Sequence, residues 1–424
     1  MLNKLFPVFL TLTLLGCSSQ SEPETSLSVN ITPEDVKTHI TFLASEELQG
    51  REAGTANEAK AANYIADLFR DFGLEPAGDD RTFFQEFTIN TALLNNPHAS
   101  EDDTTGEKRL SKNVAGLLRG TGGSDEVIIL GAHYDHLGYG EFGSLYRGEV
   151  KRIHNGADDN ASGTAGLLEL AQYFSENRPE TDILFLAFSG EEMGLLGSAH
   201  YANNPTVELE NALAMINMDM IGRMNEEKKL IIFGVGTAEK WSALADSANT
   251  EDLNLDLVED GTGASDHTSF YYKDIPVLHY FTDTHSDYHR PSDDTEYINN
   301  NGIALALRHL ERVIAQLDEL DKSDMEFIAA PGEQRQSMRL EGPTLGVLPD
   351  YGYDGDGMKI TGTNDGGAAA NAGLQSGDII IELGGKKLKD IYGYMEALNS
   401  LQKGQLTTIT VVRNGKELTL DLQL

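Results

Sequence analysis

The stretch VIILGAHYD, from Val127 to Asp135, joins an apolar run to a pair of polar side chains. Residues 127–130 are apolar and end at a glycine, a pattern typical of a buried strand in a parallel sheet. His133 and Asp135 then stand at or just beyond the carboxyl end of that strand. Open α/β sheets bind ligands at this edge, so the sequence predicts a functional site there.

A second stretch, GADDNASG at residues 156–163, leads into a helix of small residues that is expected to reach about Tyr173. It places Asp158 and Asp159 in the turn before that helix. Carboxylates and a histidine gathered at strand ends are typical ligands of a hard or borderline divalent cation. Together the two stretches predict a metal site.

The rest of the large domain alternates between strands and helices. Further strands are expected at 182–188, 213–219, 230–233 and 275–280, and helices at about 57–72, 238–248 and 300–320. This alternation predicts an α/β fold, a doubly wound and mostly parallel sheet with helices on both faces. Residues 251–269 are expected to form a loop. Acidic or histidine clusters follow several of these strands, which strengthens the case for one shared site at the sheet edge.

Composition limits the possible partners. The 424 residues carry a formal net charge of −36, and the acidic residues are dispersed along the chain. Such a surface argues against binding to nucleic acid or to anionic membranes through the folded domains. Cys17 is the only cysteine, so no internal disulfide can form and folding must rest on the core and on metal.

The N-terminal residues look like a processing signal. One lysine precedes an apolar run too short to span a bilayer comfortably. Leu14-Leu-Gly-Cys17 resembles the bacterial lipoprotein signal, which implies a lipid on Cys17 and a cell-envelope location, in the outer membrane if the bacterium is Gram-negative. The alternative is a plain secretory signal with an incidental cysteine. Residues 18–30 read as a flexible tether.

Five motifs resemble the di-zinc aminopeptidase family of bacterial leucyl aminopeptidase, whose relatives include glutamate carboxypeptidases and glutaminyl cyclases. Over residues 32–320 they occur in order as GAHYD (131–135), GADDNASG (156–163), EEMG (191–194), NMDMIG (217–222) and HRPSDD (289–294). The resemblance implies a zinc exopeptidase fold in residues 31–321. It also implies two zinc ions per chain and release of N-terminal amino acids from peptide substrates.

The resemblance assigns roles motif by motif. Each zinc would have two terminal ligands, and one carboxylate would bridge both metals; the ligands implied are His133 and Asp219 for one zinc, Glu192 and His289 for the other, and Asp158 as the bridge. Glu191 would be the general base, and Asp135 would orient His133 from behind. A cis peptide bond is implied after the bridge, between Asp158 and Asp159.

Other polar residues near these motifs are not expected to be metal ligands. Asp159 is expected to cap the following helix. Arg51 matches a family turn and is expected to pack structurally, whereas Asp266 and His267 match a segment near the substrate pocket. Three histidines near the ligand motifs are expected at the rim or in solvent: His136, His154 and His285.

Other functions remain open at this point. A glutaminyl cyclase uses one zinc on the same fold, and the presence of both His133 and Asp219 argues against it. A carboxypeptidase or dipeptidase is harder to exclude, because the substrate pocket rather than the metal site decides between them. A non-catalytic envelope peptide-binding protein on the same fold would usually lack ligands or the base, and none is missing here.

The sequence pattern changes after residue 321. Residues 322–340 lack a period and are expected to be a linker, and residues 341–424 read as short strands with glycine turns. They resemble a bacterial PDZ domain, which takes a peptide tail as an added strand. The groove is expected between a strand near 345–348 and a helix near 392–398. The alternative is a domain that only packs on the enzyme.

Overall fold

The structure is a computed structural model of the chain. It describes residues 30–91, 107–330 apart from 147 and 149, 345–349, 357–363, 367–388, and 394–424 with gaps at 395–396, 399–400, 402–403 and 414. The predicted signal segment, nearly all of the tether, residues 331–340 of the linker and most of the expected PDZ helix lie outside the described residues.

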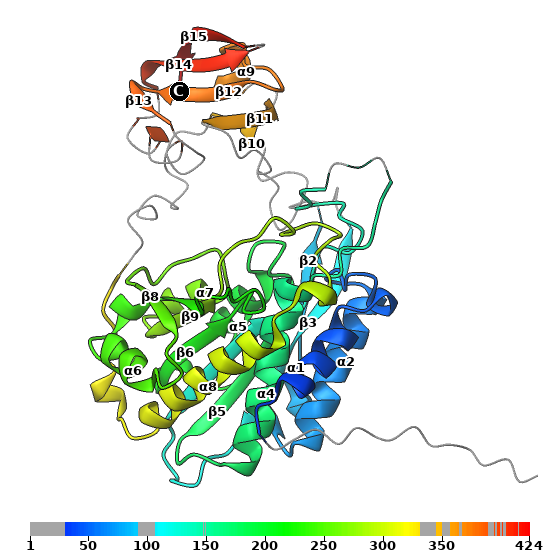
Figure 1. The fold of residues 1–424 in the computed structure, drawn as a ribbon, viewed down its shortest axis with the longest axis vertical. Helices are drawn as coiled ribbons and strands as arrows, with labels where there is room; N and C mark the ends of the chain where they lie inside the picture. The colour runs from blue at the N-terminus through cyan, green and yellow to red at the C-terminus, as the bar shows by residue number, and fades with distance from the viewer. Residues whose placement is uncertain are drawn as a thin grey trace, which may run out of the picture.

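A nine-stranded mixed sheet forms the centre of the large domain (Figure 1). Its four middle strands are parallel, as predicted, whereas β3 runs antiparallel to β5 and β7 antiparallel to β9. In order across the sheet the strands are β1 (Glu75–Pro76), β3 (Lys108–Leu118), β5 (Asp182–Phe188), β4 (Val127–His133), β6 (Ala212–Met218), β9 (Val277–Phe281), β7 (Lys229–Phe233) and β8 (Asn254–Val258), and β2 (Phe84–Asn90) pairs with β3.

Helices cover both faces of this sheet, which confirms the doubly wound α/β fold. One apolar core packs the sheet against α1 (Pro33–Leu43), α2 (Ala56–Asp71), α4 (Gly163–Glu176), α6 (Trp241–Ala248) and α8 (Asn300–Leu317). A smaller core on the other face includes residues of α5 (Leu196–Asn203) and α7 (His267–Tyr271). Because β4 and β6 are buried along their whole length, their sequences are continuous apolar runs instead of alternating patterns.

The segments expected to be a loop and a linker both differ from the prediction. The expected loop 251–269 contains β8, which was missed because it is an edge strand whose Asn254 and Asp256 face solvent. The first part of the expected linker packs on the large domain. The backbone N–H of Ile328 donates to the carbonyl of Thr237 at 2.8 Å, and the carbonyl of Ala330 accepts from Gly261 at 2.7 Å.

The C-terminal domain has its own sheet of six antiparallel strands and its own apolar core. A four-residue helix, α9 (Ala368–Asn371), precedes β12. The strands are β10 (Val347–Pro349), β11 (Met358–Thr363), β12 (Ile379–Leu383), β13 (Lys386–Lys387), β14 (Leu406–Arg413) and β15 (Lys416–Gln423). The hairpin β14–β15 turns at Gly415, one of the glycine turns expected in this region, and Asn414 is outside the described residues.

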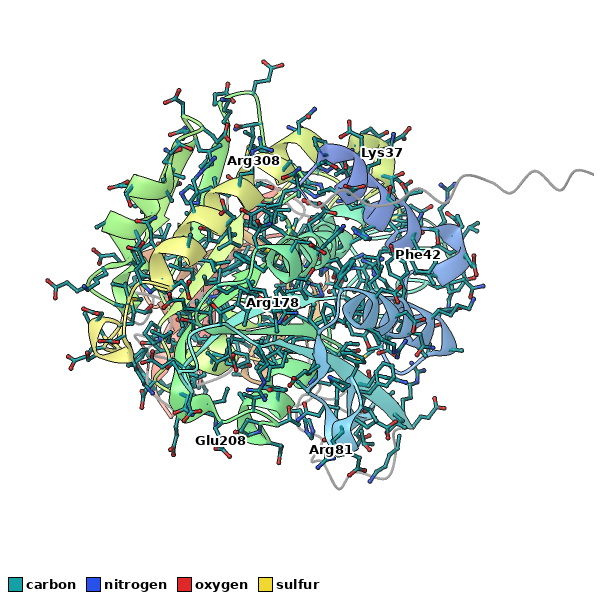
Figure 2. The ribbon with its side chains drawn as sticks, turned by 90° about the horizontal axis from the view of Figure 1, so that it is seen from below. Lys37, Phe42, Arg81, Arg178, Glu208 and Arg308 are labelled. Atoms are coloured by element: carbon teal, nitrogen blue, oxygen red, sulfur yellow. The ribbon has the colours of Figure 1, made fainter. Side chains whose placement is uncertain are left out.

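Charged side chains cover the outside of the large domain. Lys37, Arg81 and Glu208 are exposed examples from three separate parts of the chain (Figure 2). Within the described part of the chain, no helix combines the length and apolar character needed to cross a membrane.

Candidate metal centre

The polar residues predicted from the motifs meet at one edge of the sheet. His133 is the last residue of β4, Asp219 follows the last residue of β6, and Glu191 and Glu192 come just after β5. His289 arrives on the loop that follows β9. These strands are parallel, so their carboxyl ends lie together and bring residues from distant parts of the chain into one site.

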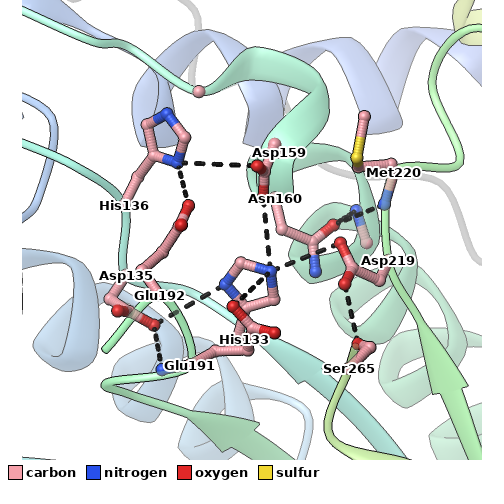
Figure 3. Close-up of polar contacts among 12 residues, drawn as sticks. His133, Asp135, His136, Asp159, Asn160, Glu191, Glu192, Asp219, Met220 and Ser265 are labelled. Atoms are coloured by element: carbon pink, nitrogen blue, oxygen red, sulfur yellow. Dashed lines mark hydrogen bonds and ion pairs between the residues drawn. The ribbon is translucent and has the colours of Figure 1, made fainter. Parts of the chain in front are cut away.

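The first donor group surrounds His133 (Figure 3). Its Nε2 lies 3.3 Å from Oδ1 of Asp219, 3.4 Å from Oδ1 of Asp159 and 4.0 Å from Oε2 of Glu191. The opposite ring nitrogen, Nδ1, lies 3.6 Å from Oδ1 of Asp135. A carboxylate behind a histidine fixes which ring nitrogen faces the metal, and Asp135 stands where the sequence predicted it.

The second donor group surrounds His289. Its Nε2 lies 3.1 Å from Oε2 of Glu192 and 3.2 Å from Oδ2 of Asp159. The other nitrogen, Nδ1, donates a hydrogen bond to the carbonyl of Gly143 at 2.8 Å. The backbone N–H of Leu145 also donates to the carbonyl of His289 at 2.9 Å. The loop carrying Gly143 and Leu145 therefore orients His289 as Asp135 orients His133.

Asp159, and not Asp158, is the carboxylate shared by the two groups. One of its oxygens faces His133 and the other faces His289. The expected capping role of Asp159 falls to Asn160, whose Oδ1 accepts the N–H of Gly163 at 2.9 Å. The cis peptide bond is likewise one residue later than predicted, between Asp159 and Asn160.

The predicted bridging role of Asp158 is therefore wrong by one residue. Its Oδ1 accepts hydrogen bonds from the N–H of Gly222 at 2.6 Å and from Oγ of Ser162 at 3.1 Å. Its Oδ2 lies 3.1 Å from Nε2 of His285. These contacts stabilise the turn that carries Asp159. Adjacent residues in a turn point in different directions, and two identical side chains give the sequence no means of telling which one faces the site.

Buried charges of opposite sign dominate the electrostatics. Burial would raise the pKa of Asp159, but hydrogen bonds with His133 and His289 hold that pKa well below its usual range. Burial and the charge of Asp159 also oppose ionisation of Glu192, yet His289 and His136 lower its pKa to about 2. These carboxylates are ionised at neutral pH, as ligands of a cation must be.

Glu191 differs from its neighbour. Burial raises the pKa of the Glu191 carboxyl well above its usual range, and the negative charge of Asp219 acts in the same direction. The backbone N–H of Glu191 donates to Oδ1 of Asp135 at 3.2 Å, which fixes the turn that carries it. A carboxyl group with a raised pKa beside a metal group is suited to accept and return a proton.

Arg51 is fully buried beneath this edge, and its expected structural role is confirmed. Its Nε donates to the carbonyl of Tyr134 at 2.7 Å, and its Nη2 donates to that of Gly156 at 2.7 Å. Nη1 donates to the carbonyls of Leu43, at 3.1 Å, and Asn155. One guanidinium thus ties the segment after β4 to the turn that carries Asp159.

The sequence did not predict two residues of the site. His136 is completely buried instead of lying at the rim, and its Nδ1 is 2.6 Å from Oε1 of Glu192. The ring of Tyr288 stacks on His289 with centroids 3.8 Å apart. Burial, together with the charges of Asp159 and Glu192, raises the pKa of the Tyr288 hydroxyl well above its usual range. Adjacency to a motif histidine was the only sequence signal for Tyr288.

The remaining predicted residues surround the centre. His154 is also buried, with Nε2 2.7 Å from Oγ of Ser144, and so is not at the rim. Asp266 is buried in the segment that follows Ser265, whose hydroxyl donates to Oδ2 of Asp219 at 2.7 Å. Burial raises the pKa of Asp266 to about 7. The predicted proximity of this segment to the site is therefore seen for Ser265.

The donor set fits a borderline divalent cation. Each group offers one imidazole nitrogen and carboxylate oxygens, the combination typical of zinc. Both proposed ligand histidines have their other ring nitrogen beside an acceptor, as metal-bound histidines almost always do. The residues present therefore fit the zinc that the motifs imply.

Comparisons with known proteins show which families the two domains match. The model of peptidase family M28 matches residues 113–317, and the PDZ domain model matches residues 337–424. Leucine aminopeptidase 2 of Trichophyton rubrum is 28% identical over 240 residues, which are 50% of this chain and 45% of that protein. The chain spans less than half the length of the curated relatives it matches first.

Solved structures show the same fold. The aminopeptidase from Aneurinibacillus sp. strain AM-1 superimposes with a TM-score of 0.54 at 19% identity, covering 71% of this chain and 98% of that one. The glutaminyl cyclase of Bacteroides thetaiotaomicron gives a TM-score of 0.53 at 19% identity, covering 68% and 98%. Family match, fold and donor set together show that the chain carries a domain of peptidase family M28 and, C-terminal to it, a PDZ domain.

Proposed function

We propose that the chain is a zinc-dependent aminopeptidase that holds two zinc ions and hydrolyses the first peptide bond of its substrates. The observation that carries this proposal is Asp159, whose two oxygens face two separate donor groups. A carboxylate in that position is suited to hold two metal ions at the separation of about 3.5–4 Å that two-metal hydrolases use. The M28 match and the aminopeptidases among the relatives support the same activity.

The proposed ligands divide evenly. His133 and Asp219 would hold one zinc, Glu192 and His289 the other, and Asp159 both. When bound, zinc supplies a Lewis acid and lowers the pKa of a coordinated water to about 7. The buried carboxylates supply the negative charge that such a pair of cations requires.

Glu191 is the proposed general base. Its carboxyl reaches to within 4.0 Å of Nε2 of His133 and is not needed as a ligand. It would take a proton from the attacking water and return it to the leaving amine. The hydroxyl of Tyr288, which stays protonated, is a further donor beside the second group and could stabilise negative charge on the substrate carbonyl oxygen.

The rival functions have less support. A one-zinc glutaminyl cyclase shares the fold but does not need the first group, which is complete here. A non-catalytic peptide-binding protein would have no use for Glu191. Carboxypeptidase or dipeptidase activity differs only in the substrate pocket, and a screen of aminoacyl, carboxy-terminal and N-terminal glutaminyl substrates separates all of these.

The decisive experiment compares two adjacent glutamates. Glu191→Gln should keep two zinc ions per chain and lower kcat by roughly 10²–10⁴-fold, the usual contribution of an acid–base group. Glu192→Gln should instead lose zinc from one site. Elemental analysis and steady-state kinetics on both variants make the comparison. Full activity in Glu191→Gln would rule out the mechanism, and zinc loss in Glu191→Gln but not in Glu192→Gln would reverse the two roles.

We also propose that Cys17 carries a lipid that anchors the mature protein in the cell envelope, so that the anchor is its only membrane contact. The Leu-Leu-Gly-Cys motif supports this. Mass spectrometry of the mature N-terminus tests it, and an unmodified terminus beyond Cys17 would exclude it. We further propose that the PDZ domain recruits long peptides by pairing with their extended tails.

A further inference from the structure

His136 occupies a fixed position next to the second donor group. Its ring packs against Gly156, where an added Cβ would lie only 2.4 Å from Cδ2 of the imidazole. Gly156 also has a φ of +56°, a backbone conformation that favours glycine. The backbone turn thus leaves room for this ring and for no side chain at Gly156. The ring therefore lies between Gly156 on one side and Glu192, 2.6 Å from its Nδ1, on the other.

The two carboxylate oxygens of Glu192 face different partners. Oε1 lies 2.6 Å from Nδ1 of His136, whereas Oε2 lies 3.1 Å from Nε2 of His289. Nδ1 of His136 is also 4.0 Å from Oδ2 of Asp159. His136, Asp159 and Glu192 therefore offer ligand atoms within 4.8 Å of one another, so the imidazole is either a further ligand or the hydrogen-bond partner of one.

The second ring nitrogen separates these two roles. Nδ1 of His289 donates to the carbonyl of Gly143 at 2.8 Å, and Nδ1 of His133, although it makes no hydrogen bond, lies 3.6 Å from the carboxylate of Asp135. Nε2 of His136 is buried and has no hydrogen-bond partner among the described residues. If Nδ1 bound a metal, Nε2 would carry a buried, unsatisfied N–H, which costs about 1–3 kcal/mol. If Nδ1 carries the proton, Nε2 is a buried acceptor without a partner instead, but Nδ1 then donates a charge-assisted hydrogen bond to Glu192 at 2.6 Å, which offsets that cost.

We propose that His136 is a positioning residue that donates its Nδ1–H to Oε1 of Glu192. This bond would occupy Oε1 of Glu192 and leave Oε2, which lies beside His289, as the oxygen that would hold the second zinc. The proposal rests on the two-zinc function proposed above. Mutating a residue that hydrogen-bonds to a metal ligand typically lowers metal affinity 10–100-fold.

The test measures zinc affinity rather than activity. His136→Leu removes the donor, His136→Asn keeps an N–H near the position of Nδ1, and His136→Gln places its N–H nearer the position of Nε2. Zinc dissociation constants of the two sites are measured by competition with a chelator, and the visible spectrum of the cobalt-substituted protein is recorded. Unfolding at saturating zinc confirms that each variant is folded.

We expect His136→Leu and His136→Gln to weaken one of the two zinc sites 10–100-fold and leave the other unchanged, and His136→Asn to restore most of the affinity. His309→Leu is the matched control. That imidazole is equally buried, but its nitrogens bond to Tyr280 and to the carbonyl of Ala245, so both zinc affinities should stay as they are.

Two results would overturn the proposal. If His136→Asn loses one zinc as completely as Glu192→Gln does, with a changed cobalt spectrum, the imidazole is a ligand. If His136→Leu keeps both affinities, the hydrogen bond has no role in positioning. A wild-type protein that binds two zinc ions but hydrolyses no peptide would contradict the proposed function and leave this inference standing.

Discussion

Glu58, a buried carboxyl group that is not a proposed zinc ligand, makes the stability of the folded protein depend on pH. It lies on α2, is 1% exposed, and accepts a hydrogen bond from Oγ of Ser111 at 3.1 Å. The hydroxyl of Tyr134, the residue between His133 and Asp135, also bonds to it. Burial raises the pKa of Glu58 from 4.5 to about 7. The folded protein therefore holds this proton more tightly than the unfolded chain does.

The sign of the pH effect follows directly. Because the folded pKa is the higher one, the stability that Glu58 contributes is complete below about pH 4.5 and is lost as the pH rises through about 7. A shift of about 2.5 units at about 1.4 kcal/mol per unit corresponds to roughly 3 kcal/mol. That is a sizeable part of the 5–15 kcal/mol typical of a folded domain.

Glu58→Gln should remove this dependence, because the amide cannot ionise and still offers an oxygen to Ser111. Between pH 5 and pH 8, the free energy of unfolding of the wild type should fall by up to roughly 3 kcal/mol more than that of the variant. Urea titrations at saturating zinc measure this through Trp241, the only tryptophan, which is buried in the large domain.

Glu86→Gln, at an exposed position on β2, is the control and should follow the wild type. Equal losses of stability in the wild type and Glu58→Gln over this pH range would refute the reasoning. So would a variant that is less stable than the wild type at pH 8, because the buried charge would then be favourable.

Three further predictions concern the site and the tail. Asp159→Asn should lose zinc from both sites, whereas Asp158→Asn should keep two zinc ions by elemental analysis; the reverse result would restore the assignment made from sequence. Tyr288→Phe should lower kcat by about 10²-fold with zinc content unchanged, and an unaltered kcat would remove the hydroxyl from the mechanism. A chain ending at residue 330 should keep both zinc ions and hydrolysis of small aminoacyl substrates, and zinc loss on truncation would make the tail part of the catalytic fold.

The sequence predicted the central strands well because their burial on both faces leaves long apolar runs such as Val127–Leu130. It predicted β8 poorly, because an edge strand needs apolar side chains on one face only. The choice between Asp158 and Asp159 depends on which way a turn directs two identical side chains. No pattern in the residues carries that information.

His136 shows a second feature that the sequence could not predict, the burial of a side chain beside the site. A histidine three residues after a ligand can lie inside or outside the site, depending on how the chain continues past the strand. Its ring packs against Gly156, a residue 20 positions later at which any side chain would collide with it. Proximity of that kind exists only after the fold has formed.

The order of the strands means that the two proposed zinc sites would be completed at different stages of synthesis. In the sheet β9 lies between β6 and β7, although both of these are made before it. The proposed ligands of the first zinc are complete at Asp219, while the second waits for His289, which follows β9. A growing chain can thus assemble the first site early. The second site can form only after β9 has inserted between β6 and β7. Binding of the second zinc would therefore follow the insertion of β9 into the sheet.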